Sequence, residues 1–136
     1  MAQGVGVRLG VAELAYLGDA VFELMVRDML IKSGVPFASL NKQAKKYVSA
    51  LGQSEMYHRI FDQLSAEEQA VMKRGRNLHS ASRSKNAGVV EYRHATGLEA
   101  LFGQLYAEGQ FERLKEVFDL CLVGNVDDLG KGLQPR

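Results

Sequence analysis

Residues 14–23 read LAYLGDAVFE, and this stretch decides how the chain folds. It lies within Val11 to Ile31, where apolar residues recur every three or four positions, as on one face of a helix: Leu14, Leu17, Val21, Leu24, Met25 and Met29. Gly18 and Asp19 interrupt this apolar face, although both lower helix propensity. A carboxylate there is costly unless a hydrogen-bond donor or a cation compensates it. Taken alone, Asp19 is most simply interpreted as bonded to a nearby loop.

A second segment changes the interpretation of Asp19. Residues 96–106 read TGLEALFGQLY, with Glu99 among apolar residues and Gly103 one turn later. Thr96 and Glu99 also fit a capping box, which would make Glu99 the start of a helix. We favour a position inside a helix, because the preceding residues 89–95 already have a helical pattern. Glycine at 18 and 103 would then let two helices approach closely and bring Asp19 and Glu99 together.

The rest of the chain also has helical patterns. Period-two alternation is nearly absent, so no strand is predicted. Ser65 and Glu68 predict a capped helix start, and the Ser-, Gly- and Asn-rich residues 78–88 predict a loop. The expected helices are Val11–Ile31, Ser39–Leu51, Ser54–Leu64, a helix from Ser65 to about residues 73–77, Val89–Ala107 and Phe111–Leu122. We therefore predict one all-α domain over residues 1–136, with its core in 9–122 and a frayed tail in 123–136.

Length and composition fit a globular protein. The chain has 136 residues, of which 46% are hydrophobic and 24% charged, enough for one domain with its own core. No apolar run approaches the roughly 20 residues that span a bilayer, and we expect no signal peptide. A single cysteine, Cys121, excludes an internal disulfide and favours a reducing compartment. The expected location is the cytoplasm.

Charge is unevenly distributed along the chain. Residues 38–94 carry ten Lys/Arg and five Asp/Glu, a net of +5, whereas the flanks carry seven and eleven, a net of −4. A basic middle between acidic flanks favours a polyanionic partner. By itself this charge pattern is more often typical of a solvated surface.

Several common catalytic motifs are missing. The three histidines and one cysteine lack the spacing of a structural zinc site, and there is no HExxH, GxSxG or GxxxxGK[ST] motif. What remains is carboxylate chemistry with a hard cation such as Mg²⁺ or Mn²⁺.

Two segments resemble the catalytic motifs of the ribonuclease III family. LAYLGDAVFE (14–23) is similar to that family's signature helix, and LEALFG (98–103) to its second catalytic segment. With RGRN (74–77), Lys85-Asn86 and YRHATGLEALFG (92–103), the sequence most resembles the Mini-III ribonucleases. These are bacterial enzymes that consist of a ribonuclease III catalytic domain alone. The resemblance extends over residues 9–122.

The chain departs from ribonuclease III at three acidic positions. That family has glutamates four and seven residues before the signature aspartate, where this chain has Ala15 and Ala12. It also has an acidic residue three positions before the second-segment glutamate, where this chain has Thr96. Only Asp19 and Glu99 therefore carry over as metal ligands. With fewer carboxylates, a cation would keep more water or use phosphate oxygens.

The resemblance implies a Mg²⁺-dependent endoribonuclease, with Mn²⁺ as a substitute, that cleaves double-stranded RNA and leaves 5′-phosphate and 3′-hydroxyl ends. Asp19 and Glu99 would be catalytic and hold the metal. It also implies a homodimer in which Tyr16 seats in a socket of the partner subunit. The implied task is maturation of the large-subunit (23S) ribosomal RNA precursor, with a large-subunit ribosomal protein as a candidate helper. Glu23, one turn after Asp19, is either an outer carboxylate or a surface residue.

The grip on RNA is expected from the basic middle of the chain, since no double-stranded-RNA-binding domain is expected after the helices. Duplex RNA is recognised mostly through phosphates and 2′-hydroxyls. The candidates for these contacts are Arg74, Arg76, Asn77 and Lys85. The lysines at 42, 45 and 46 are weaker candidates, explained as well by a solvated helix face.

Two other functions stay open on the residues alone. One is a non-catalytic RNA- or ribosome-binding helical module, favoured by the missing upstream glutamates. The other is a small-molecule metal phosphohydrolase, disfavoured because the common His-Asp dipeptide is absent.

Overall fold

The computed structural model describes residues 9–78 and 87–133, with side-chain surroundings for 9–78 and 89–122. The described residues form helices and turns and contain no strand, which confirms the all-α prediction. The α-helices are α1 (Val11–Lys32), α2 (Leu40–Val48), α3 (Ala50–Ile60), α4 (Ala66–Arg76), α5 (Ala87–Ala107) and α6 (Phe111–Leu133). Short 3₁₀ turns at Phe37–Ser39 and Phe61–Gln63 precede α2 and follow α3.

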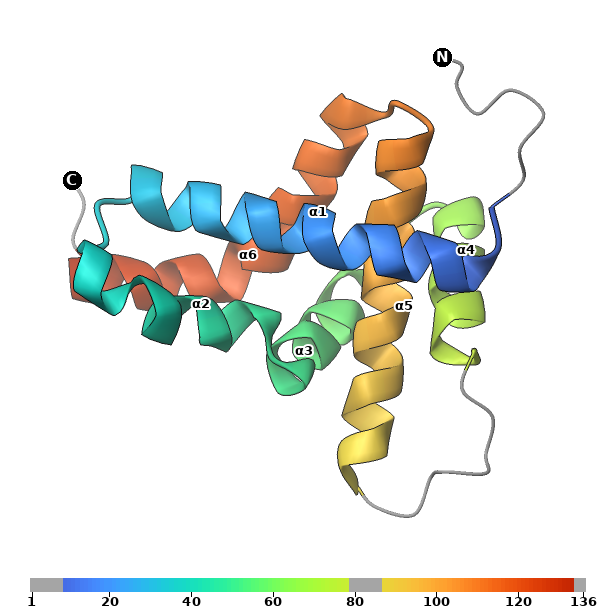
Figure 1. The fold of residues 1–136 in the computed structure, drawn as a ribbon, viewed down its shortest axis with the longest axis horizontal. Helices are drawn as coiled ribbons and strands as arrows, with labels where there is room; N and C mark the ends of the chain where they lie inside the picture. Colours follow the sequence, from blue (N-terminus) through green and yellow to red (C-terminus); the bar gives the residue numbers. More distant parts are fainter. Residues whose placement is uncertain (1–8, 79–86, 134–136) are drawn as a thin grey trace.

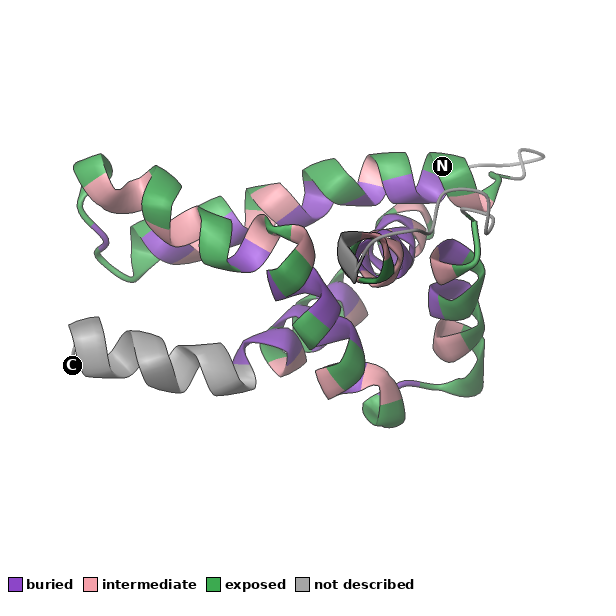
Figure 2. Cartoon of the chain, turned by 90° about the horizontal axis from the view of Figure 1, so that it is seen from below, coloured by how far each residue is buried: buried purple, intermediate pink, exposed green. Residues whose placement is uncertain are grey.

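Helix α5 is the centre of the fold. Helices α1, α3 and α4 all pack against it, and α1 lies across it at a steep angle (Figure 1). Seen from below, α5 is viewed nearly along its axis, with the buried sides of α1 and α4 turned toward it (Figure 2). Phe22 of α1 meets Phe102 of α5 edge to face, with 5.2 Å between ring centroids. Edge-to-face contacts of this kind add to the stabilisation that apolar burial supplies.

The long first helix ends where the sequence predicted. Gly34 adopts a φ of +86°, a left-handed conformation that favours glycine. The Val35 N–H then donates to the Leu30 carbonyl at 3.1 Å, which satisfies one of the carbonyls that a helix end leaves open.

The second predicted helix is wrong at its end. Instead of running to Leu51, the chain breaks at Ser49, whose backbone is extended (φ −68°, ψ 160°). The Ser49 hydroxyl accepts a hydrogen bond from the Gly52 N–H at 3.0 Å and caps α3. Helix α3 therefore begins at Ala50, ahead of the predicted Ser54.

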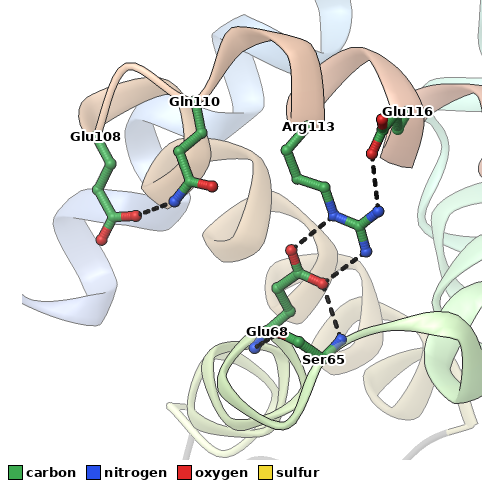
Figure 3. Close-up of polar contacts among 6 residues, drawn as sticks. All are labelled: Ser65, Glu68, Glu108, Gln110, Arg113 and Glu116. Carbon is green, nitrogen blue, oxygen red and sulfur yellow. Dashed lines mark hydrogen bonds and ion pairs between the residues drawn. The ribbon is translucent and has the colours of Figure 1, made fainter.

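The predicted capping box of α4 is present and is part of a larger network (Figure 3). The Ser65 hydroxyl accepts from the Glu68 N–H at 3.1 Å, and the Glu68 carboxylate accepts from the Ser65 N–H at 2.9 Å. Arg113 of α6 donates twice to that same carboxylate at 2.8 Å and once to Glu116 at 3.0 Å. This network connects the start of α4 to α6, and Arg113 holds the pKa of Glu68 below its usual value.

The final helix is longer than predicted. It begins at Phe111 as expected but continues to Leu133, so the predicted end at Leu122 is wrong. Gly124 lies inside this helix, where a glycine costs only about 1 kcal/mol relative to alanine.

Candidate active site

The site begins at the crossing of α1 and α5. A Cβ placed at Gly18 would overlap the Glu99 carbonyl oxygen, and one placed at Gly103 would overlap the Leu14 carbonyl oxygen. The two backbones therefore touch, and only glycine permits that contact. This confirms the predicted close approach. Asp19 follows Gly18 directly, so the crossing sets its side chain beside Glu99.

Electrostatics show that the two carboxyl groups interact. The pKa of Glu99 is raised to about 8, first by burial and second by the negative charge of Asp19. The two side chains also share a hydrogen bond, which favours a protonated Glu99. Glu99 is half-buried, whereas Asp19 is exposed. The placement of Asp19 on a buried apolar face is thus wrong: the carboxylate lies at the rim of that face and needs no loop partner.

The position of Glu99 inside its helix is as predicted. Helix α5 starts well before it, and the Thr96 hydroxyl donates to the Tyr92 carbonyl at 3.0 Å, an ordinary bond within a helix. The capping-box interpretation of Thr96 and Glu99 is therefore excluded.

The donor set fits a hard cation. Carboxylate oxygens are what Mg²⁺ prefers, and two such groups whose charges repel each other are stabilised by a cation between them. Among the residues whose surroundings the structure describes, no group of three or more His, Cys, Asp or Glu side chains could hold a metal. Asp19 and Glu99 would supply two carboxylates, and water or substrate oxygens would complete the coordination shell.

The sequence analysis missed one residue at the site. Gln53 of α3 is buried, with 2% of its surface exposed, and its side-chain amide acts to lower the pKa of Glu99 against the effect of burial. Because the break at Ser49 was not predicted, Gln53 fell between two predicted helices. The signal that could have found it is Ser49 itself, a preferred residue at the start of a helix.

Two other predicted residues lie beside Asp19. Tyr16 and Glu23 line one open surface pocket together with Asp19. Glu23 accepts a hydrogen bond from Arg27 at 2.6 Å, so its charge is already partly engaged. Tyr16 is 86% exposed, the largest aromatic surface on this part of α1.

Three of the four residues predicted to contact RNA lie at the C-terminal end of α4. Arg74 and Asn77 are exposed and Arg76 is half-buried, with its Nε donating to the Asn77 side-chain oxygen at 3.1 Å. Lys85 lies outside the described residues, as does the adjoining part of the predicted loop. The lysines at 42, 45 and 46 are exposed on α2.

Three comparisons relate this chain to known proteins. Residues 12–110 match the family model of the Ribonuclease III domain. Mini-ribonuclease 3 of Thermoanaerobacter sp. (strain X514) is 45% identical over 110 residues, 80% of this chain and 78% of that protein. Mini-ribonuclease 3 of Brevibacillus brevis is 47% identical over 105 residues, 76% of this chain and 78% of that protein.

Structural similarity agrees with these sequence matches. An X-ray crystal structure of a Fusobacterium nucleatum protein superposes with a TM-score of 0.74 at 33% identity, covering 91% of this chain and 99% of that one. Within the described residues, no helix has the length and apolar character needed to span a membrane.

Proposed function

We propose, from the premise that this chain belongs to the ribonuclease III family and is an endoribonuclease, that Asp19 and Glu99 form its catalytic pair. The observation that carries the proposal is the α1–α5 crossing, which brings Asp19 beside Glu99, while burial and then the charge of Asp19 raise the pKa of Glu99 to about 8. Charge repulsion of this kind is typical of sites that bind a cation or a shared proton.

The substrate is double-stranded RNA, and the cofactor is Mg²⁺, for which Mn²⁺ can substitute. When bound, the cation would supply activation of the attacking water and neutralise charge on the phosphate. Asp19 and Glu99 would hold it through one oxygen or more each. Glu99 would hold the cation as a carboxylate, so cation affinity should rise with pH up to the pKa of that carboxyl group.

The products carry 5′-phosphate and 3′-hydroxyl ends, and the cellular task is maturation of the 23S ribosomal RNA precursor in the cytoplasm, with a large-subunit ribosomal protein as helper. Support comes from the similarity to proteins called Mini-ribonuclease 3. Arg74, Arg76, Asn77 and Lys85 contact phosphates or sugars of the duplex. For the first three, support comes from their basic or polar character and from the exposure of Arg74 and Asn77 at the end of α4.

A homodimer would place one site against each strand. The exposed ring of Tyr16 supports this assembly, because an isolated aromatic side chain with 86% exposure is well suited to insert into a partner surface. Tyr16 lines the same surface pocket as Asp19, so the subunit interface would adjoin the catalytic pair.

The test is cleavage of a long RNA duplex by the Asp19→Asn variant in Mg²⁺. We expect kcat to fall by about 10³-fold or more, as when a group that stabilises transition-state charge is removed, with duplex binding unchanged. Asp28→Asn is the matched control, because Asp28 is exposed on the same helix and paired only with Lys32 at 3.1 Å. Wild-type turnover by Asp19→Asn would overturn the proposal.

The unsubstituted protein provides the companion measurement. It should cut the duplex in Mg²⁺ and leave the separated single strands intact, and a chelator should abolish cleavage. Duplex binding without cleavage at any cation concentration would instead indicate a non-catalytic module of the same fold.

A further inference from the structure

Two histidines meet at the surface where α3, α4 and α5 converge. His58 of α3 is exposed and His94 of α5 is half-buried, and their ring centroids are 4.4 Å apart. The His94 Nδ1 lies 2.9 Å from the Val90 carbonyl oxygen. Because a carbonyl oxygen only accepts, Nδ1 carries a proton and donates it there, which leaves Nε2 as the nitrogen that can bind another group.

Close packing around Gly97 holds this pair in place. A Cβ at Gly97 would come within 2.7 Å of the Tyr57 ring and 2.5 Å of the Met72 carbonyl oxygen, so α3 and α4 both touch α5 here. The Tyr57 ring packs edge to face on His94, with 4.7 Å between centroids. The backbone nitrogen of Arg76 would lie 3.2 Å from the same Cβ, so the last turn of α4 adjoins this packing.

The cluster contains a buried hydroxyl that lacks a partner. Tyr57 is 3% exposed, and its hydroxyl has no hydrogen-bond partner among the residues with described surroundings. Burial raises the pKa of Tyr57, and the nearby charge of Arg76 opposes that rise. An unsatisfied hydroxyl costs free energy, which a ligand that accepts its hydrogen bond would recover.

Arg76 supplies a charge that no described carboxylate neutralises. It is half-buried, and its Nε donates to the neutral side-chain oxygen of Asn77 at 3.1 Å. Among the residues with described surroundings, no Asp or Glu forms an ion pair with it, whereas Arg27 and Arg113 each pair with a glutamate. A partly buried guanidinium without a counter-charge favours the binding of an anion.

We propose that His58, His94 and Arg76 form a phosphate-binding site for the backbone of the RNA duplex. The Tyr57 hydroxyl is a further donor. This inference rests on the proposed function, which already assigns Arg76 to the RNA. Five positions separate His94 from Glu99, which corresponds to about 7.5 Å along α5 and about 140° around it. The phosphate bound here is therefore a different one from the phosphate that is cleaved.

Protonation of the histidines should strengthen this binding. Burial lowers the pKa of His94, and the charges of His58 on α3 and Arg76 on α4 lower it further. Glu91, on α5 itself, acts in the opposite direction. A phosphate beside the ring raises that pKa, so binding takes up a proton and RNA affinity should rise as the pH falls from 7.5 to 5.5. The phosphodiester keeps its single charge over this range.

The test compares the wild type with the double variant His58→Gln/His94→Gln, whose side chains still form hydrogen bonds but cannot take up a proton. Arg59→Gln is the control, because Arg59 follows His58 on α3 but donates to the Cys121 carbonyl of α6 at 2.7 Å. Duplex affinity is measured without divalent cations at pH 5.5 and pH 7.5 over a range of salt concentrations. The kcat and KM in Mg²⁺ are measured at both pH values. Titration of Glu99 is common to all three proteins and cancels in the comparison.

On lowering the pH, affinity should rise about tenfold more in the wild type than in the double variant, the size of one added charge-assisted hydrogen bond. The slope of log affinity against log salt should steepen by about one to two in the wild type alone, because each phosphate contact contributes about 0.9 in duplex DNA. At pH 5.5 the KM of the double variant should be raised and its kcat unchanged. Arg59→Gln should keep the pH dependence of the wild type. Equal pH dependence and equal salt slopes in the wild type and a folded double variant would overturn the inference.

Two further measurements keep the outcome decisive. If the double variant does not fold, the exposed His58→Gln is used alone: a weaker pH dependence supports the inference and an unchanged one overturns it. Sulfate replaces phosphate as a free anion of constant charge, and its effect on the melting temperature is compared at pH 5.5. Sulfate stabilisation that the histidine substitutions abolish, with duplex affinity unchanged, would overturn the RNA contact and assign the site to a free phosphate.

The cleavage assay separates this inference from the proposed function. If the wild type cleaves duplex RNA and the histidine variants keep its pH dependence, the phosphate site alone fails. If the wild type neither binds nor cleaves duplex RNA, the proposed function fails as well.

Discussion

Glu99 keeps its proton near neutral pH in the folded protein, because its pKa is raised. At a pH where the unfolded chain has lost that proton, this difference lowers the free energy of unfolding. The pKa of Glu99 is about 8 in the folded protein and near 4.5 in an unfolded chain. Between these values unfolding releases a proton, so stability falls as pH rises through that window and levels off above it.

Glu99→Gln should therefore stabilise the protein at pH 8.5 and change it little near pH 4.5. The full shift corresponds to several kcal/mol, but Glu99 is only half-buried and solvent screens it, so we expect about 1–3 kcal/mol. Urea unfolding without divalent cations at pH 5 and pH 8.5 measures the difference. Glu112→Gln, on the exposed start of α6, should show no such dependence; an equal gain in both variants would contradict this account.

At this scale the sequence was informative about the reacting groups and less so about their surroundings. Asp19 and Glu99 stand out because each carboxylate falls in a largely apolar helical segment, with a glycine directly before Asp19 and another one turn after Glu99. Gln53 did not stand out, because an amide in a polar stretch has no periodic signature and its burial depends on where α3 begins. The exposure of Asp19 could not be predicted from the sequence either, because it depends on the angle at which α5 crosses α1.

Among the contacts between helices, the α1–α5 crossing should tolerate substitution least. Gly103→Ala would place a methyl group on the Leu14 carbonyl oxygen, which the α1 backbone must move to avoid. Overpacking of this kind exceeds the gain in helix propensity of about 1 kcal/mol, so we expect a net loss of about 2 kcal/mol or more and of cleavage activity.

Gly10→Ala is the control for that substitution. Its Cβ meets only the end of the flexible Glu13 side chain, so we expect a change of about 1 kcal/mol or less. Thermal unfolding and cleavage assays compare the two variants. Equal stability and full activity of Gly103→Ala would mean that the helices can separate without harm to the site.

The start or end of a helix could be predicted where the spacing of apolar residues agreed with capping or helix-ending residues. The end of α1 at Gly34 and the capped start of α4 at Ser65 are confirmed. The break at Ser49 was missed because the apolar spacing continues through it, although Ser49 caps α3 and Gly52 packs closely on the end of α2. The end of α6 was predicted too early because glycine weakens a helix without having to end it.

For the molecule as a whole, the link between Glu68 and Arg113 joins segments that are far apart in sequence. The side chains of Glu68 and Arg113 are 13% and 29% exposed, respectively. The Glu68 carboxylate both takes part in the cap of α4 and pairs with Arg113. Arg113→Met removes the partner of a largely buried charge, so we expect a loss of about 1–3 kcal/mol at pH 7.

The contribution of the Glu68–Arg113 pair to the free energy of unfolding should depend on pH. Arg113 lowers the pKa of Glu68, so its stabilisation is present above pH 4.5 and is lost as pH falls through the lowered pKa of the folded protein. Urea unfolding from pH 7 to pH 3 should show the wild type and Arg113→Met converging at the acid end. Arg27→Met, which breaks the exposed pair with Glu23, should cost about 0.5 kcal/mol or less at any pH.

The backbone contact at Gly18 and Gly103 also bears on how this enzyme loses activity. Amide protons near Glu99 lie on the helix against which three others pack, so their exchange with solvent requires the entire globule to open rather than one frayed segment. Loss of activity on heating should then coincide with the unfolding transition. No partly unfolded intermediate that keeps some activity should be populated between the native and denatured states.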